Sequence, residues 1–232
     1  ILATGGASHP ETGSTGDGFS WLAALGHATA KPTPTIVPLK VKDGWVKKLA
    51  GTSIAAMKIT FFVRGVKKFS RTGALLFTHF GISGPTILNS AGKVADLLQE
   101  GSVTAALDLY PEHDIGALDR KIMTIFDAHK NKLLKNVFKD IAPPGTSDAL
   151  LALLPHIDHD TKVHSVTKEE RRQIVELLKH VPMTITGLMG FDRAVVADGG
   201  LALTEVDTRT MRSRLYENLF VTGDLLHIRR PS

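Results

Sequence analysis

Apolar and polar residues change their spacing several times along this chain of 232 residues, and each change predicts a new element. The apolar residues Ile1–Ala3 run directly into a loop that contains five glycines up to Gly18. This pattern predicts a buried strand that ends where the backbone closely approaches another group. From Asp17 to Ala30 the apolar residues follow helical spacing, and Gly26 provides a stop signal.

Strand-like patterns dominate the next part of the chain. Three prolines make residues 31–38 extended, and we expect this segment to cross between domains. Alternating apolar residues then predict strands over Ile54–Val63, Ala74–Phe80 and Val103–Leu109. The basic segment 66–71 (VKKFSR) lies between the first two, where we expect a solvated hairpin edge.

Residues 111–182 have a helical period instead. Apolar residues between positions 118 and 141 recur every three or four residues, which predicts one long amphipathic helix. A short leucine-rich helix is expected over Ser147–Leu154, and Thr167 with Glu170 forms a capping box that opens a third helix. Strand-like sequence resumes after this helical insert.

Composition narrows the class of protein. With 43% hydrophobic and 22% charged residues the chain is an ordinary globular sequence. No apolar run approaches the roughly 18 residues of a membrane span. The lack of cysteine excludes disulfides and thiol chemistry, so a reducing, cytoplasmic compartment is expected. The net charge of +5 is modest, and the cations at 119–140 interleave with an apolar stripe, so nucleic acid is not an expected partner.

The two ends of the chain share one pattern. The predicted buried strand Leu219–Val221 runs into the turn Thr222–Asp224, as the first strand runs into Thr4–Gly6. A Gly-Asp pair after a strand of a parallel sheet places a carboxylate where open α/β folds bind ligands. An isolated pair of this kind is more often a tight turn. Because the chain begins inside a predicted strand and without Met, we expect a fragment of a longer protein.

Three stretches taken together resemble a known family. They are ATGG, TGSTGDG and LGH within residues 3–27, LLFTHFGISGPTIL at 75–88, and EVDTRTMRSRLYENLFVTGDLL at 205–226. In order and spacing they are similar to the HI0933-like flavoproteins (YhiN/BaiN type), which include proteins of the aminoacetone oxidase type. The similarity extends along essentially the whole chain.

This resemblance implies an α/β (α+β multidomain) fold. It would consist of a partial Rossmann-like FAD-binding domain, a β-rich and barrel-like substrate or cap domain that interrupts it, and a helical insert. The corresponding segments are 1–38 with 211–232, 39–110 with 183–210, and 111–182.

The resemblance also implies chemistry, namely an FAD-dependent oxidoreductase that acts on a small organic substrate by hydride transfer, with NAD(P)H as a candidate donor. The implied cofactor-binding residues are Thr4, Gly5, Gly6, Gly13, Gly16, Asp17, Gly18, Gly223 and Asp224. The chain lacks the family's G-x-G-x-x-G unit, so we expect it to bind FAD weakly or not at all by itself. The alternative is a non-catalytic interaction or scaffold module that has lost the cofactor.

Other candidate residues carry weaker signals. His79 is the candidate catalytic residue, and two interpretations stay open: a buried histidine bonded to a carbonyl, or a group that faces flavin or substrate and moves a proton. Ser14 and Ser83 lie in glycine-rich turns but do not fit G-x-S-x-G, so a serine hydrolase is not expected. The His and Asp residues at 156–164 match no standard ligand spacing, and no metal is expected.

Overall fold

The structure is a computed structural model that describes residues 1–228 of the chain. Its contacts divide the chain into two compact units. The barrel unit comprises residues 39–87 and 96–187, and the terminal unit comprises residues 1–38, 88–95 and the chain from residue 188 onward.

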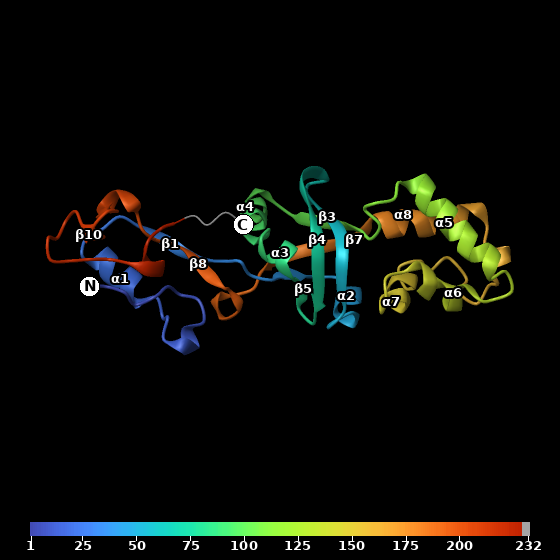
Figure 1. Cartoon of the computed structure of the whole chain (residues 1–232), viewed down its shortest axis with the longest axis horizontal. Helices are drawn as coiled ribbons and strands as arrows, with labels where there is room; N and C mark the ends of the chain where they lie inside the picture. Colours follow the sequence, from blue (N-terminus) through green and yellow to red (C-terminus); the bar gives the residue numbers. More distant parts are fainter. Residues whose placement is uncertain (229–232) are drawn as a thin grey trace. The chain divides into compact units, whose positions relative to one another are not determined.

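A closed antiparallel barrel of six strands forms the centre of the barrel unit (Figure 1). The strands, in their order around the barrel, are β2 (Leu39–Val41), β5 (Gly81–Ser83), β4 (Val66–Thr78), β3 (Ser53–Val63), β6 (Val103–Asp108) and β7 (Val181–Leu188). The expectation of a β-rich, barrel-like domain is therefore confirmed. Three short helices accompany the barrel strands in the chain, namely α2 (Gly44–Lys48), α3 (Pro85–Leu88) and α4 (Ala91–Glu100).

Alternation along β3 determines which side chains fill the barrel. Met57, Ile59 and Phe61 are fully buried, whereas the residues between them are partly exposed. The turn from β3 to β4 consists of Arg64 and Gly65, both with positive φ, at 50° and 78°. Such a two-residue turn matches the twist of a hairpin, so strand pairing continues through Val63 and Val66. The segment VKKFSR, expected at a solvated hairpin edge, forms the first part of strand β4 in this hairpin.

The helical insert of the barrel unit consists of α5 (Ile115–Ala128), α6 (Leu134–Ile141), α7 (Ser147–Leu151) and α8 (Lys168–Lys179). The predicted capping box is present, because Thr167 Oγ1 accepts from the Glu170 amide while the Glu170 carboxylate accepts from the Thr167 amide.

The prediction of a single helix over 118–141 is wrong, because the chain leaves helical geometry at residues 129–133. Leu133 is extended and forms an antiparallel bridge with Lys162, and the amide of Leu134 donates to Thr161 O at 2.8 Å. These bonds to a distant segment replace the helical bonds that the apolar spacing had predicted. The apolar stripe is nevertheless continuous in the core, since Ile122 and Val137 are both fully buried.

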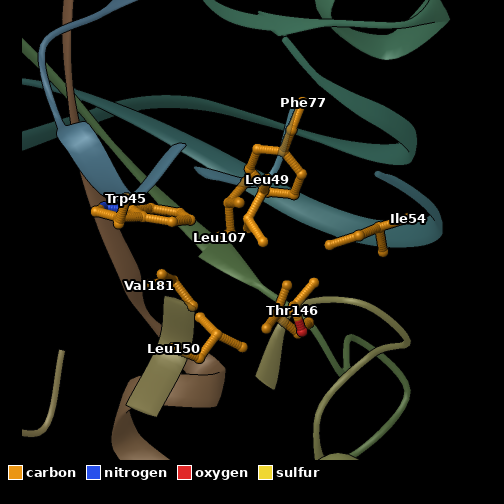
Figure 2. Close-up of a pocket in the computed structure, with 9 residues that line it drawn as sticks. Trp45, Leu49, Ile54, Phe77, Leu107, Thr146, Leu150 and Val181 are labelled. Carbon is orange, nitrogen blue, oxygen red and sulfur yellow. The ribbon is translucent and has the colours of Figure 1, made fainter. Parts of the chain in front are cut away.

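Helix α7 packs against one end of the barrel through apolar side chains (Figure 2). Leu150 of α7 and the preceding Thr146 face Trp45 of α2, Phe77 of β4 and further apolar side chains across a small gap. The gap leaves no room for a water molecule, so it is a packed joint between barrel and insert rather than a ligand site.

The terminal unit has a smaller core and short elements. Its strands pair as β1 (Thr29–Thr35) with β8 (Val196–Leu201) and as β9 (Val206–Asp207) with β10 (Arg212–Ser213), all antiparallel. Helix α1 covers Asp17–Ala24, and single 3-10 turns occur at Pro10–Thr12, Phe191–Arg193, Leu203–Glu205 and Gly223–Leu225. Phe19 and Leu22 of α1 pack in a buried cluster with Leu201, Val206, Val221, Leu225 and Leu226.

Residues 31–38 are extended as expected: residues 31–35 belong to β1, which pairs with β8, and the barrel unit begins directly after residue 38. Another sequence expectation meets a different arrangement. Residues 183–210, expected in the β-rich domain, are divided: β7 closes the barrel, while β8 belongs to the terminal unit. A Rossmann-like parallel sheet is not formed by residues 1–228, in which parallel pairing is limited to the bridges Leu2–Val221 and Leu201–Leu226. No helix within the described part of the chain is long and apolar enough to cross a membrane.

Candidate functional site

The two ends of the chain meet in the terminal unit, as their shared sequence pattern suggested. Leu2 and Val221 form a parallel bridge, in which the Leu2 amide donates to Phe220 O at 2.7 Å and the Thr222 amide donates to Leu2 O at 3.1 Å. Because the two segments run parallel, the glycines that follow each of them emerge at the same end.

The glycines at this end let the two segments touch. A Cβ placed on Gly6 would lie only 3.2 Å from Asp224 Cβ, and one on Gly5 would lie 2.9 Å from Ser14 Oγ. Gly5 and Gly223 also have positive φ, 74° and 75°, which side chains disfavour. We call residues Thr4–Gly6, Gly18 and Gly223–Leu225 the terminal cradle.

Helix α1 joins the terminal cradle through Gly18. A Cβ on Gly18 would lie 2.3 Å from Thr4 Oγ1 and 2.6 Å from Leu225 Cδ2, so only glycine lets the first turn of the helix approach both segments. Gly16 precedes the helix with a φ of 83° and provides no side-chain cap. The Asp17 carboxylate accepts from Thr15 Oγ1 at 2.8 Å.

The loop between the opening strand and α1 contains a buried hydroxyl that the sequence had not singled out. Ser8 Oγ is buried and has no hydrogen-bond partner in the described residues. Buried polar atoms are almost always paired, so this hydroxyl, two residues after Gly6 in the chain, can bond to a water molecule or to a bound polar group. Gly13, in contrast, has no atom within 4 Å of the position where a Cβ would be.

His27 connects the end of α1 to residues 205–216. Its Nδ1 lies 3.1 Å from Glu205 Oε2 and its Nε2 lies 3.1 Å from Ser213 Oγ, with the imidazole fully buried. Ser213 Oγ already accepts the amides of Leu215 and Tyr216, at 3.1 and 3.0 Å. The hydroxyl therefore donates to Nε2, and Nδ1–H donates to Glu205.

The spacing of Ser213, His27 and Glu205 resembles that of a hydrolytic triad, but the chemistry differs. Ser213 is only 4% exposed and its oxygen accepts two amide bonds, so it is neither accessible nor available as a nucleophile. The three side chains instead hold the segment that leads to Gly223. The histidine of the LGH motif was the sequence signal, and its role was missed because both partners lie about 180 residues away.

Two carboxylates at the surface, of Glu11 and Asp207, stabilise turns of the terminal unit. A hydrogen bond from its own backbone amide, and a second contact with His9 Nδ1 at 2.9 Å, lower the pKa of Glu11. The amide of Arg209, which donates to Asp207 Oδ1 at 3.0 Å, is the main cause of the lowered pKa of Asp207. Both groups are therefore anionic at neutral pH.

His79 lies in the barrel unit, in the turn between β4 and β5. The side chain is exposed and its ring meets Phe80 edge-on at 4.9 Å, so the interpretation as a buried histidine bonded to a carbonyl is wrong. Val41 of β2 donates its amide to Phe80 O at 3.2 Å, which fixes the turn on the barrel.

The His and Asp residues at 156–164 serve local structure. His156 Nε2 contacts Gln173 Oε1 at 2.7 Å, His159 Nε2 contacts Leu154 O at 3.1 Å, and Asp160 pairs with Lys135. Within residues 1–228 no group of three or more His, Asp or Glu side chains could hold a metal ion. The insert also contains a hollow of about 300 Å³ beside Phe126, Val163 and Arg171.

A closed barrel with a helical insert, together with a glycine-rich unit built from both ends of the chain, defines a protein of mixed α/β structure. Residues 33–196 match the family model described as "HI0933-like protein barrel and H2TH domain". The chain therefore belongs to the HI0933-like family, and the resemblance inferred from its sequence is confirmed.

Three characterised relatives match nearly the whole chain. The chain is 29% identical over 229 residues to a 3-dehydro-bile acid delta(4,6)-reductase of Clostridium scindens, covering 98% of this chain and 56% of the relative. It is 26% and 24% identical over 230 residues to the ribosomal RNA dihydrouridine synthases of Haemophilus influenzae and Escherichia coli, covering 98% of this chain and 54% of each relative. The chain thus spans about half the length of these relatives.

Proposed function

We propose that this chain supplies part of the cofactor site and the substrate-facing domain of an FAD-dependent reductase. The observation that carries this proposal is the terminal cradle, in which the backbone at Gly6 lies against Asp224 with no space for a side chain between them. The Cβ position of Gly223, the neighbour of Asp224, has no atom within 4 Å, so a bound cofactor can approach the backbone closely there.

The chemistry of the terminal cradle fits the hydroxyl-rich middle of FAD. The Asp224 carboxylate would accept hydrogen bonds from ribityl hydroxyls, and the orphan Ser8 hydroxyl would find a partner. FAD, when bound, supplies the hydride chemistry, and the protein holds and orients it. The proposal assigns the diphosphate-binding glycines, and the rest of a Rossmann-like domain, to the half of the relatives' length that this chain does not span.

The names of the relatives narrow the proposed reaction class. One is a delta(4,6)-reductase of a 3-dehydro-bile acid and two form dihydrouridine in ribosomal RNA. Each name describes reduction of a carbon–carbon double bond, and in both kinds of substrate that bond is conjugated with a carbonyl. We therefore propose reduction of a polarised double bond, with His79, exposed on the barrel, as the group that delivers the proton.

The cofactor proposal can be tested with Asp224→Ala in the full-length protein. Charge-assisted hydrogen bonds contribute about 1.5–3 kcal/mol each, so the Kd for FAD should rise by roughly tenfold or more. The measurement is the flavin absorbance that co-elutes with the protein, followed by titration of the apoprotein. Asp192→Ala is the matched control, because Asp192 is an exposed carboxylate of the same unit whose partner is the neighbouring Arg193.

Equal flavin content in wild type and Asp224→Ala would contradict the assignment of Asp224. A full-length wild-type protein that binds no flavin would instead support the non-catalytic alternative. His79→Gln tests the proton donor separately: the rate of substrate reduction should fall while flavin content stays unchanged.

A further inference from the structure

Positive charge is concentrated in the first half of the barrel. Residues 39–87 contain nine Lys and Arg but only one acidic residue, Asp43. Asp43 Oδ2 accepts the amide of Thr184 at 2.6 Å, so this carboxylate is used within the fold. The net charge of +5 for the whole chain conceals this asymmetry, because the remaining residues are net acidic. That is why the sequence alone did not lead us to expect nucleic acid.

Five of the nine cations lie on the β3–β4 hairpin, and we call them the basic hairpin: Lys58, Arg64, Lys67, Lys68 and Arg71. Buried residues alternate along β3, so Lys58, Thr60 and Phe62 point outward between them. Their β4 partners on the same face are Thr72, Ser70 and Lys67. Thr60 Oγ1 and Ser70 Oγ lie 2.9 Å apart, which confirms the shared face.

This outward face presents cations at both ends and hydroxyls between them. Lys67 lies opposite Phe62, and Phe62 is four residues from Lys58 along β3. Lys58 and Lys67 are therefore about 13 Å apart along the hairpin. The hairpin also extends past β5, which pairs only with residues Leu76–Thr78 of β4 (Figure 1). Its distal half is therefore bordered by β6 on the β3 side.

Few carboxylates neutralise the basic hairpin. Glu100 pairs with Lys68 at 2.6 Å, and its carbonyl oxygen accepts from Arg64 at 3.3 Å. Asp108 lies opposite Lys58 on β6, but its carboxylate pairs with Lys179 at 2.6 Å. Neither Lys58 nor Lys67 has an ion pair in the part of the chain that the structure describes.

We propose that the outward face of the β3–β4 hairpin binds the phosphate backbone of RNA. Lysines at both ends would contact phosphates, the hydroxyls of Thr60 and Ser70 would bond to phosphate or ribose oxygens, and the partly exposed Phe62 offers a ring on which a base can stack. The inference deepens the proposed function, on which it rests for the reaction, by naming RNA as the substrate class.

RNA fits this face better than a small ligand with a single negative charge. Such a ligand does not require several cations spread along a hairpin. The helical insert, by contrast, is electrically balanced, with eleven basic and eleven acidic residues between positions 111 and 182. An RNA surface on the insert is therefore less favoured than one on the barrel.

The test uses the full-length protein, a fluorescein-labelled RNA stem-loop and fluorescence anisotropy at several salt concentrations. Lys58→Gln combined with Lys67→Gln removes two phosphate contacts. The slope of log Kd against log salt should then fall by about 1.4–1.8, and Kd at 0.1 M salt should rise roughly tenfold or more. The thermal melting temperature and flavin content should match wild type, since both side chains lack described ion pairs.

The matched control is Lys132→Gln combined with Lys139→Gln, which removes the same charge from exposed positions of the insert. Unchanged RNA affinity in this control, with loss in the hairpin variant, supports the proposal. Equal losses in both variants, or no RNA binding by wild type, would overturn it. So would binding of phosphatidylserine vesicles in preference to RNA. Because binding is measured without turnover, failure of the RNA surface is distinguishable from failure of the flavin site.

Discussion

Lys179 at the end of α8 attaches the helical insert to the barrel. Its Nζ lies 2.6 Å from Asp108 Oδ2 at the end of β6, and it donates to the backbone carbonyls of Tyr110 and His113 at 2.9 and 2.6 Å. The residue is only 9% exposed. Replacement by methionine keeps a stem of similar length and removes the ammonium group, so it isolates the polar contacts.

The expected loss in the free energy of unfolding depends on the Asp108 carboxylate that remains after the substitution. Removing one partner of a buried ion pair costs about 3–5 kcal/mol, because the other charge stays behind without compensation. The Asp108 side chain is 17% exposed, and its Oδ1 still accepts the Tyr110 amide at 3.0 Å. We therefore expect a loss at the lower end of this range, about 3 kcal/mol. This is a large part of the free energy of unfolding of a typical protein, about 5–15 kcal/mol.

Urea unfolding of wild type and Lys179→Met measures this loss in the free energy of unfolding. Lys132→Met, an exposed lysine of the same insert, should change it by less than about 0.5 kcal/mol. Combining Lys179→Met with Asp108→Asn should cost clearly less than the sum of the two single changes. A loss below about 1 kcal/mol for Lys179→Met, or additive effects in the double variant, would refute the reasoning.

Two further predictions concern packing in the terminal unit and alkaline pH. Gly18→Ala should lower the free energy of unfolding, measured with urea, by about 1–3 kcal/mol, because the added Cβ meets Thr4 Oγ1 and the buried Leu225. The control Gly187→Ala should be near neutral, because the space around the added Cβ is open. Burial raises the pKa of the Tyr110 hydroxyl above its ordinary value of 10.0. The folded state therefore retains the proton, so stability is constant below the unfolded value and falls as the pH rises from there toward the folded pKa. Free energies of unfolding measured from about pH 9 to 11 should fall in wild type, and this fall should be absent in Tyr110→Phe. Equal pH profiles for the two proteins would contradict the prediction.

Local patterns predicted much of the barrel and the start of α8. Period-two alternation identified the strand from Ile54 to Val63 and its buried face, because each alternate side chain of a strand points to the same side. The capping box at Thr167 could also be predicted from the sequence, since both of its hydrogen bonds form within four residues. The end of helix α5 at Ala128 could not be predicted, because its cause is the bridge from Leu133 to the distant Lys162.

The sequence by itself determined the family, the barrel-like domain with its helical insert, and the two glycine-rich ends. These depend on local spacing and on motifs that are present in the chain itself. Only the tertiary structure decided that Gly6 and Gly18 close against Asp224 and Leu225, that β8 leaves the barrel to pair with β1, and that His27 binds Glu205 and Ser213. Each of these contacts joins residues more than 100 positions apart, and no local pattern specifies which distant segment supplies the partner.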